Sequence, residues 1–416
     1  MLDLAKETAL KPIPDLGISD NEILARYFIA KSDADRGADA MIVEGIGYGV
    51  GQITDANGLR IIPCKEMLSG RQRSQITHII ARGVVNAEWC YVDIGISANI
   101  IDLKVLGFTG LFSLLAGDVF GGPYVREGLV LHSISIPKCI ISAFPGPRFG
   151  SEGVLKKCGA SHTGIILGLL LKPDLGVSPK HYADLAEAAA QGGIDYIKED
   201  ELSLDSSICS RLSRVESIYN RLITCGRKPL YAANATAPAY KLLGICRQIV
   251  ECGASVLLIN GLQVGLDAIA EISAATDVLV PIHLHRAGYD ILTTGTKAIS
   301  ITCLTEMFRL SGADIIHVGS PLGGIFPLGV ISENIRCLTQ QIYNMKRSLP
   351  VFSRSSMDTL EMVLSSSIAK HAMLLFDAYF YESSIGVERS IRRLKDRIER
   401  QTTIRPESTG AAGCSV

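Results

Sequence analysis

The sequence predicts an α/β protein in which a (β/α)8 TIM barrel follows an N-terminal α+β domain of the ferredoxin-like type. The chain has 416 residues, more than one small hydrophobic core accommodates. A segment rich in proline and glycine, residues 144–150, separates a mixed first part from a regular second part. In the second part short apolar runs alternate with amphipathic stretches, and this alternation is typical of a closed parallel barrel.

The first part, residues 1–140, carries the signals of a mixed domain. Residues 76–80 and 89–94 are rich in β-branched and aromatic side chains and predict strands, whereas residues 109–116 predict a helix. An earlier stretch with the sequence TDANG, residues 54–58, predicts a turn. At the other end of the chain, residues 401–416 are polar and small and predict a disordered tail.

The second part, residues 141–400, supplies eight strand–helix units. The expected strands are residues 166–171, 194–197, 230–233, 255–259, 278–284, 315–318, 350–352 and 373–376. The expected helices are residues 180–190, 206–224, 239–251, 265–274, 294–310, 330–346, 358–370 and 386–400. Eight such units in about 250 residues fit a barrel. The alternative is an open doubly wound sheet, but no G-x-G-x-x-G turn follows the first strand.

Composition excludes several classes of partner. The formal net charge is -1, which offers no general attraction for nucleic acid or for an anionic membrane. No uninterrupted apolar run reaches the roughly 18 residues of a membrane-spanning helix, and the N-terminus lacks the apolar core of a signal peptide. The 11 cysteines are scattered without a C-x-x-C pair. We therefore expect a cytoplasmic protein that acts on a small molecule.

One strand ends in an unusual group of charges. Its apolar residues are followed directly by Lys198, Glu199, Asp200 and Glu201. Strand alternation puts Lys198 and Asp200 on one face, and Glu201 marks the exit. Oxygen ligands packed this closely suit Mg²⁺, and the lysine joins them as a ligand only if its amine becomes an anion, for example a carbamate formed with CO₂. The alternative is a solvated charge cluster at a strand end.

Polar side chains also follow the other expected strands. In a barrel these strand ends meet at one mouth, where the chemistry takes place. The residues concerned are Lys172, Asn234, His283, His285, Arg286, His317, Ser353, Arg354, Ser355 and Asp377. Each has a simpler alternative: a histidine satisfied within the core, a solvated loop lysine, or, for Asn234, a helix cap.

The motifs at these strand ends resemble those of a known family. They are KPDLGVS at 172–178, GGIDYIKEDE at 192–201, NATA at 234–237, HLHRA at 283–287 and IHVG at 316–319. In order and spacing they resemble the large subunit of ribulose-bisphosphate carboxylase (RuBisCO), and more closely the non-carboxylating RuBisCO-like proteins of form IV. The resemblance covers most of residues 140–400, and its clearest N-terminal trace is residues 115–121.

The resemblance implies roles for the matching positions. Lys198 carries the carbamate, and Asp200 and Glu201 complete the Mg²⁺ ligands. Lys172 moves protons, and His285 lies near the metal and the substrate hydroxyls. The remaining matches bind one phosphate or other parts of the substrate: Arg286, His317, Ser353 and Asn234. The family also implies a homodimer or a multiple of dimers, with each site at the junction of one barrel and the partner's N-terminal domain.

Departures from the family pattern restrict the reaction. Gly324 stands where carboxylases have a loop lysine, so carbon fixation is not expected. In the nest of glycine amides that holds a second phosphate, the glycines are replaced by Ser355, Asp377 and Ala378, and an aspartate there repels a dianion. Further positions differ or match only in part: Glu44 agrees with a residue that is lent to the neighbouring site, whereas Gly49, Val50, Gly110, Asp174 and Tyr289 replace polar residues.

The sequence thus predicts a Mg²⁺-dependent enzyme that abstracts a proton next to a carbonyl on a small sugar-derived substrate that carries at most one phosphate. Isomerisation and enolisation are the expected outcomes. The alternatives are a decarboxylase or transcarboxylase–hydrolase in sugar-acid breakdown, a methionine-salvage enolase or isomerase, and a barrel that has lost catalysis and serves in binding or regulation.

Overall fold

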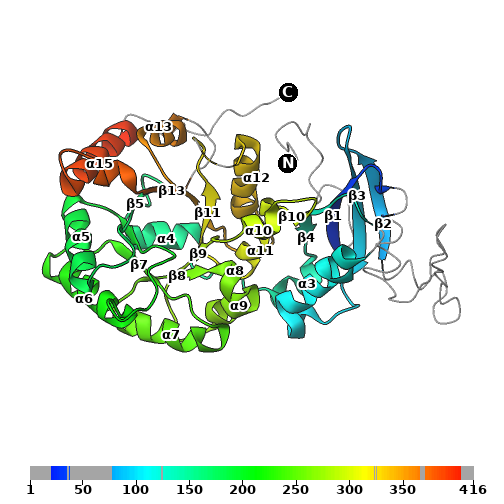
Figure 1. Cartoon of the computed structure of the whole chain (residues 1–416), viewed down its shortest axis with the longest axis horizontal. Helices are drawn as coiled ribbons and strands as arrows, with labels where there is room; N and C mark the ends of the chain where they lie inside the picture. Colours follow the sequence, from blue (N-terminus) through cyan, green and yellow to red (C-terminus); the bar gives the residue numbers. More distant parts are fainter. Residues whose placement is uncertain are drawn as a thin grey trace, which may run out of the picture.

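The computed structural model describes residues 20–34, 37, 77–122, 125–322, 324, 326–365 and 371–403 (Figure 1). The expected turn at 54–58 and the positions Glu44, Gly49 and Val50 lie outside these residues. Figure 1 shows the chain as a barrel of helices and strands beside a smaller, mostly antiparallel sheet with the helix α3.

The N-terminal sheet has the strand order of a ferredoxin-like domain. Its own strands are β1 (Glu22–Ala30), β2 (Thr77–Val84), β3 (Trp89–Ser97) and β4 (Leu129–Ser135), in the spatial order β4-β1-β3-β2. All three pairings are antiparallel. The strands expected at 76–80 and 89–94 are confirmed, and so is the ferredoxin-like class.

Strand β1 was not expected from the sequence. Its apolar residues are interrupted by the charged residue Arg26. Eight of its nine residues are buried between β3 and β4. Arg26, the charge, forms a two-pronged hydrogen bond with Asp93 on β3, at 2.6 and 2.7 Å. Pairing both charges across neighbouring strands lets the sheet bury them.

Helix α3 (Leu103–Gly121) covers this sheet and contains the helix expected at 109–116. Leu111, Leu114, Leu115 and Val119 are buried in the core cluster that also holds β1 and β3. Among the described residues α3 alone is long and apolar enough to cross a membrane by length and composition. Its backbone departs from helical geometry at Gly107 and Gly117.

The second part closes into a barrel of eight parallel strands, as expected. The strands are β5 (Ile165–Leu170), β6 (Tyr196–Lys198), β7 (Leu230–Asn234), β8 (Val256–Asn260), β9 (Ile282–His285), β11 (Ile315–Gly319), β12 (Leu349–Phe352) and β13 (Ala372–Phe376). All eight expected strands are found, each within a few residues of its expected bounds.

The barrel helices follow the expected order, with corrections at their ends. They are α5 (Pro179–Gly192), α6 (Arg211–Thr224), α7 (Ala239–Glu251), α9 (Leu266–Ala274), α11 (Ile301–Leu310), α12 (Leu328–Thr339), α13 (Met357–Ser365) and α15 (Val387–Thr403). Shorter elements are η4 (Lys138–Ala143), α4 (Gly150–Cys158), α8 (Gly261–Val264), α10 (Asp290–Thr293) and α14 (Ala378–Tyr381). The helix expected at 330–346 ends at Thr339, and α15 runs three residues into the expected tail.

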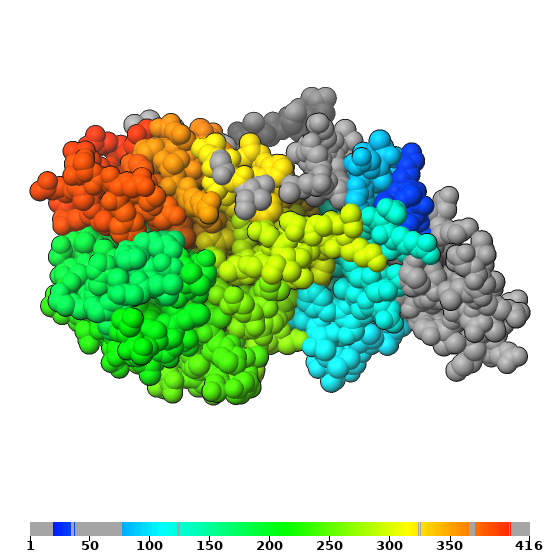
Figure 2. All heavy atoms as spheres, in the orientation of Figure 1, coloured from blue at the N-terminus to red at the C-terminus, as the bar shows by residue number. Residues whose placement is uncertain are grey.

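The helix expected at 294–310 is wrong over its first turns. Residues Lys297–Ile299 form a strand, β10, which pairs in parallel with β4 and becomes the edge of the N-terminal sheet. The barrel segment between β9 and β11 therefore completes the sheet of the other domain. In Figure 2 the yellow surface of this segment reaches across to the cyan N-terminal domain.

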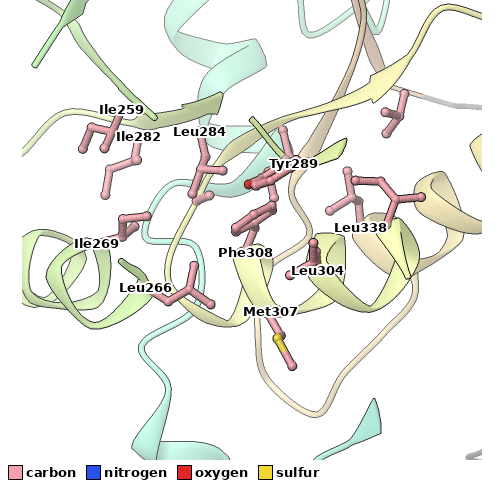
Figure 3. Packing of buried hydrophobic residues seen from close by; sticks show 14 of the residues in the cluster. Ile259, Leu266, Ile269, Ile282, Leu284, Tyr289, Leu304, Met307, Phe308 and Leu338 are labelled. Atoms are coloured by element: carbon pink, nitrogen blue, oxygen red, sulfur yellow. The ribbon is translucent and has the colours of Figure 1, made fainter. Parts of the chain in front are cut away.

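A continuous core lies beside this junction (Figure 3). The ring of Tyr289 stacks on Phe308 of α11, with centroids 4.9 Å apart and planes 18° apart. Leu284 of β9 and Leu304 of α11 belong to the same cluster. Tyr289, which replaces a polar residue of the family pattern, thus packs in the core and does not line the pocket.

Candidate active site

A pocket of about 330 Å³ lies at the carboxyl ends of the barrel strands. This volume is within the usual range for small-molecule sites. The pocket is lined by Leu170, Lys172, Lys198, Asp200, Glu201, His285, Arg286, His317, Ser320, Gly324, Phe326, Ser353, Arg354, Leu375 and Asp377. Of the residues to which the resemblance assigned a role, all but Asn234 line this pocket.

Lys198 ends strand β6, and its side chain is almost fully buried. Its Nζ donates a hydrogen bond to the carbonyl oxygen of Glu199, 2.9 Å away. Burial lowers the pKa of the Lys198 ammonium to about 8, although the nearby carboxylates of Asp200 and Glu201 oppose this shift. A substantial share of the amine is therefore neutral near pH 8, and only a neutral amine reacts with CO₂.

Asp200 and Glu201 form a coupled pair of carboxyl groups. Burial raises the pKa of Glu201, and the hydrogen bond with Asp200 raises it further. Burial also opposes ionisation of Asp200, but hydrogen bonds from Glu201 and Lys172 outweigh it and lower the pKa of Asp200. The pair therefore holds a proton between two oxygens more readily than two separate carboxylates, as expected where charge of one sign is concentrated.

Lys172 follows strand β5 and reaches the same carboxylates. Its Nζ lies 2.8 Å from Asp200 and 3.2 Å from Asp174. Burial alone would lower the pKa of Lys172, but the hydrogen bonds and charges of these two carboxylates raise it. Lys172 is therefore a cation beside these carboxylates.

Glu199 points away from the pocket, because strand alternation places it on the other face from Lys198 and Asp200. Its carboxylate binds Arg214 at 2.7 and 3.0 Å and accepts hydrogen bonds from the Tyr231 hydroxyl and the Asn234 amide. Only two of the three carboxylates in the run thus face the pocket.

Asn234 holds the loop that carries these carboxylates. Its side-chain amide donates to the carbonyl oxygens of Asp200 and Glu201, at 2.9 and 3.0 Å, and its oxygen accepts from the amide of Thr236. With its side chain buried and occupied in this way, Asn234 positions the loop, and the structure does not place it where the sequence prediction did, against a substrate.

A chain of hydrogen bonds runs from the barrel interior to the pocket. The Tyr196 hydroxyl lies 2.7 Å from His283 Nδ1, His283 Nε2 lies 2.9 Å from His317 Nε2, and His317 Nδ1 lies 2.7 Å from Ser353 Oγ. Burial lowers the pKa of both histidines well below the usual value, so both rings are neutral.

The hydrogen bonds of this series have one favoured direction, from Tyr196 as the first donor to Ser353 as the last acceptor. Burial raises the pKa of Tyr196 well above its ordinary value, so its hydroxyl keeps its proton and donates it to His283 Nδ1. Each neutral ring has one N–H, so His283 donates to His317 and His317 donates to Ser353. The Ser353 hydroxyl is then left to donate into the pocket. His317 lines the pocket as expected, and in this arrangement its N–H is directed at Ser353.

The sequence analysis did not identify Tyr196 as part of the site, although its spacing from Lys198 indicates that it faces the same side. It precedes Lys198 by two residues in the same strand, and alternation places both on one face.

His285 and Arg286 bring a neutral donor and a cation to the pocket. His285 Nδ1 accepts a hydrogen bond from the amide of Ala287, so its proton is on Nε2, 3.6 Å from Glu201. Arg286 stacks over the ring of Phe326 at 4.8 Å. Burial lowers the pKa of Arg286 to about 10, which leaves it charged at neutral pH. Among the described residues its buried Nη1 has no hydrogen-bond partner.

The structure shows the surroundings of two positions that depart from the family pattern, Gly324 and the former glycine nest. A Cβ added at Gly324 would lie 2.2 Å from the carbonyl oxygen of Ser320, so this loop conformation accepts no side chain. Asp377 accepts a hydrogen bond from the amide of Ala378 at 2.7 Å, and the amide of Ser355 donates to Leu375 at 3.0 Å. The amides of Ala378 and Ser355 are thus used within the protein.

The comparisons with known proteins agree with this geometry. The family model for the ribulose bisphosphate carboxylase large chain, catalytic domain, matches residues 150–326. A ribulose bisphosphate carboxylase-like protein of Bordetella bronchiseptica is 31% identical over 243 residues, which cover 55% of this chain and 56% of that protein. Residues 150–326 thus match the catalytic domain of the RuBisCO large chain, and the chain is similar to RuBisCO-like proteins of this superfamily.

Other proteins to which the chain is similar carry different names. A ribulose bisphosphate carboxylase of Archaeoglobus fulgidus is 29% identical over 58% of both chains. A 2,3-diketo-5-methylthiopentyl-1-phosphate enolase of Exiguobacterium sibiricum is 28% identical, over 58% of this chain and 62% of that one. A 3-oxo-isoapionate-4-phosphate transcarboxylase/hydrolase of Xanthobacter autotrophicus is 30% identical over 50% of both. The chain thus spans little more than half the length of the curated relatives it matches.

Solved structures show the same fold over a greater length. The octameric RuBisCO of Pyrococcus horikoshii OT3 superimposes with a TM-score of 0.81 at 20% identity, covering 93% of this chain and 89% of that one. A rubisco-like protein of Alicyclobacillus acidocaldarius gives a TM-score of 0.79 at 22% identity, covering 93% and 95%. The chain therefore has the same fold as these structures.

Proposed function

We propose that this protein is a RuBisCO-like, Mg²⁺-dependent enzyme that moves a proton next to the carbonyl of a small sugar-derived monophosphate, without fixing CO₂. The observation that carries the proposal is one pocket that is lined by Lys198, Asp200 and Glu201 together with Arg286, whose buried Nη1 has no hydrogen-bond partner among the described residues. The first three residues suit a metal, and the fourth suits an anionic group of the substrate.

The donor set fits Mg²⁺. Asp200 and Glu201 lie close enough for the hydrogen bond between them to raise the pKa of Glu201, and a divalent cation between two such carboxylates relieves their repulsion. Among the described residues no three His, Cys, Asp or Glu side chains form a metal-binding group. A third anionic oxygen is therefore needed, and a carbamate on the buried amine of Lys198 would supply it. When bound, Mg²⁺ stabilises the negative charge of an enediolate.

Protein side chains supply the proton transfers and the orientation. Lys172 is an ammonium beside Asp200, so it enters the reaction as a proton donor. It can accept a proton only after Asp200 has ceased to be its partner. Arg286 and the hydroxyl of Ser353 donate to the substrate phosphate, and the Nε2 proton of His285 is available to a substrate oxygen.

Gly324 supports a reaction other than carboxylation. No cation can be placed at this loop position without moving the loop, because any Cβ there meets the Ser320 carbonyl. Arg286 and Ser353 still offer a place for one phosphate, whereas Asp377 occupies the amide of Ala378. This arrangement weakens the methionine-salvage enolase as an analogue, because that enzyme's phosphate is expected in the glycine nest.

A second candidate is a transcarboxylase–hydrolase acting on a β-keto sugar acid. It is favoured by the similarity to the transcarboxylase/hydrolase of Xanthobacter autotrophicus. Its carbanion intermediate has the charge distribution of an enediolate, so the same pocket and the same proton donor, Lys172, serve both reactions. Assembly as a homodimer, and a cytoplasmic location, are part of the same proposal.

The test measures exchange of solvent deuterium into D-ribulose 5-phosphate, with and without Mg²⁺ and bicarbonate. We expect exchange that needs both additions, together with one added CO₂ on Lys198 detected by mass spectrometry. Lys198→Met abolishes the exchange, and Lys172→Met lowers its rate by about 100-fold or more. Lys180→Met is the matched control, because Lys180 is an exposed lysine that pairs with Asp184 outside the pocket.

Two outcomes would contradict the proposal. If exchange proceeds equally without Mg²⁺, the metal has no role in the reaction. If no CO₂ is added, no exchange occurs and Mg²⁺ does not raise the melting temperature, the protein is a binding or regulatory barrel.

A further inference from the structure

Arg354 is an exposed arginine in an unusual backbone conformation at the pocket wall. It follows strand β12 and lines the pocket with Ser353. Its φ is +50°, in the left-handed region that glycine adopts freely and other residues avoid. Among the described residues one other non-glycine residue has a positive φ, Tyr343, and it lies away from the pocket.

The pocket therefore contains two guanidinium groups, and neither takes part in an ion pair among the described residues. Arg286 is buried with an unpartnered Nη1, and Arg354 opens to solvent. The other lining cation with a fixed charge, Lys172, is already paired with Asp200 and Asp174. Two unpaired guanidinium groups facing one cavity indicate a substrate with two anionic groups.

The group bound by Arg354 is not a second phosphate. Asp377 lines the same cavity, and its carboxylate accepts the amide hydrogen of Ala378. The amide of Ser355, next to Arg354, donates to Leu375. A phosphate dianion would meet the negative charge of Asp377 with neither of these amides to stabilise it. A carboxylate carries half that charge and matches the two parallel N–H groups of a guanidinium.

We propose that Arg354 selects substrates that carry a carboxylate in addition to the phosphate, that is, phosphorylated sugar acids. The inference rests on the proposed function, because it takes the phosphate to be bound by Arg286 and Ser353. Arg354 is then the specificity-determining residue of the pocket. Its unfavourable left-handed backbone is explained by the placement of the guanidinium at the pocket wall.

The test compares two ligands that differ only at the group in question. The 5-phospho-D-ribonate ion has a carboxylate at the carbon where D-ribitol 5-phosphate has a CH₂OH group. Binding is measured by calorimetry on the full chain without added Mg²⁺, so that no metal holds the carboxylate. We expect the wild-type protein to bind the acid at least about tenfold more tightly than the alcohol.

Three variants of Arg354 separate charge, geometry and backbone strain. Arg354→Gln removes the charge and brings the ratio of the two affinities to about one, without changing binding of the alcohol. Arg354→Lys keeps the charge without the paired N–H groups and gives an intermediate ratio. Arg354→Gly also brings the ratio to about one but raises the melting temperature, by about 1–2 °C, because it relieves the left-handed backbone. A loss of affinity that accompanies a gain in stability cannot come from misfolding.

The outcomes that overturn the proposal are distinct. If Arg354→Gln keeps the preference for the acid, another residue recognises the carboxylate. If Arg354→Gln weakens binding of the alcohol as much as binding of the acid, Arg354 binds the phosphate or shapes the loop. If D-ribulose 1,5-bisphosphate binds the wild-type protein more tightly than the acid, the region accepts a second phosphate. If the alcohol binds but the acid binds no better, this inference alone fails; if neither binds, the monophosphate site of the proposed function fails with it.

Discussion

Lys198 is a buried amine at which stability and function oppose each other. Among the described residues it forms no ion pair, and its hydrogen bond goes to the carbonyl oxygen of the next residue. Burial lowers its pKa from 10.5 to about 8. Because the folded-state pKa is below the unfolded value, the unfolded chain binds more protons between these two pH values. The free energy of unfolding therefore rises with pH from about 8 to 10.5, and the penalty is fully present below pH 8.

Lys198→Met should therefore stabilise the protein while abolishing the proposed activity. The pKa difference corresponds to about 3 kcal/mol at pH 7, and the gain should shrink to near zero above pH 10.5. Urea unfolding of both proteins at pH 7 and pH 10.5, without bicarbonate, measures this difference. Lys172→Met is the comparison: the pKa of Lys172 is raised, so its removal gives no such gain. A Lys198→Met protein less stable than the wild type at pH 7 would refute the argument.

At the scale of elements, the alternation of side chains along the three-residue strand β6 decides which of its residues face the pocket. Tyr196 and Lys198 face the barrel interior and the pocket, and Glu199 beyond them faces Arg214 and Tyr231. Hydrogen bonds continue from Tyr196 to His283 of β9 and His317 of β11, and these two histidines join Tyr196 to Ser353. The direction of the Ser353 hydroxyl is therefore set by a tyrosine on a different strand.

Tyr196→Phe tests this dependence. Without the hydroxyl, His283 Nδ1 loses its donor, which costs about 1–2 kcal/mol of stability, and both rings can take the other tautomer. The Ser353 hydroxyl then turns toward His317, and binding of D-ribitol 5-phosphate should weaken by about threefold to tenfold. Calorimetry measures the affinity, and ¹⁵N NMR of the histidine rings reports the tautomers.

Tyr182→Phe is the matched control for this variant. Tyr182 is also buried, but its hydroxyl donates to Asp174 and contacts Ser203, outside the histidine chain. It should lose stability without changing the histidine tautomers. Unchanged tautomers in Tyr196→Phe would show that the direction of the chain is set elsewhere.

The sequence predicts those parts of the fold and the pocket that depend on local pattern. Apolar runs ending in polar residues identify all eight barrel strands and most of the pocket lining, because parallel strands deliver their carboxyl ends to one mouth. It does not predict β10, because Lys297–Ile299 precedes a helix and becomes a strand only by pairing with β4, far away in the chain. It also does not show that Asn234 holds the loop of Asp200 and Glu201, because this loop follows another strand.

At the scale of the whole molecule, the barrel and the N-terminal domain are joined by side-chain as well as strand contacts. Asp267, in the first turn of barrel helix α9, accepts hydrogen bonds from the amides of Phe108 and Thr109 and from the Thr109 hydroxyl, at 2.7, 2.8 and 2.7 Å. These amides belong to α3 just after Gly107, where the helical geometry is interrupted. Asp267 thus caps a helix of the other domain.

Asp267→Ala should loosen the N-terminal domain more than the barrel. Loss of the cap costs about 1–2 kcal/mol, and the cost falls on α3, whereas β10 still pairs with β4. Trp89 is the single tryptophan of the chain and lies on β3, so its fluorescence follows the N-terminal sheet, while far-UV circular dichroism follows mainly the barrel helices. In urea the fluorescence midpoint should fall below the dichroism midpoint in the variant. Asp358→Ala, which removes a first-turn acid from barrel helix α13, should leave the two signals together. If Asp267→Ala behaves in the same way, the strand pairing through β10 alone holds the two domains in one cooperative unit.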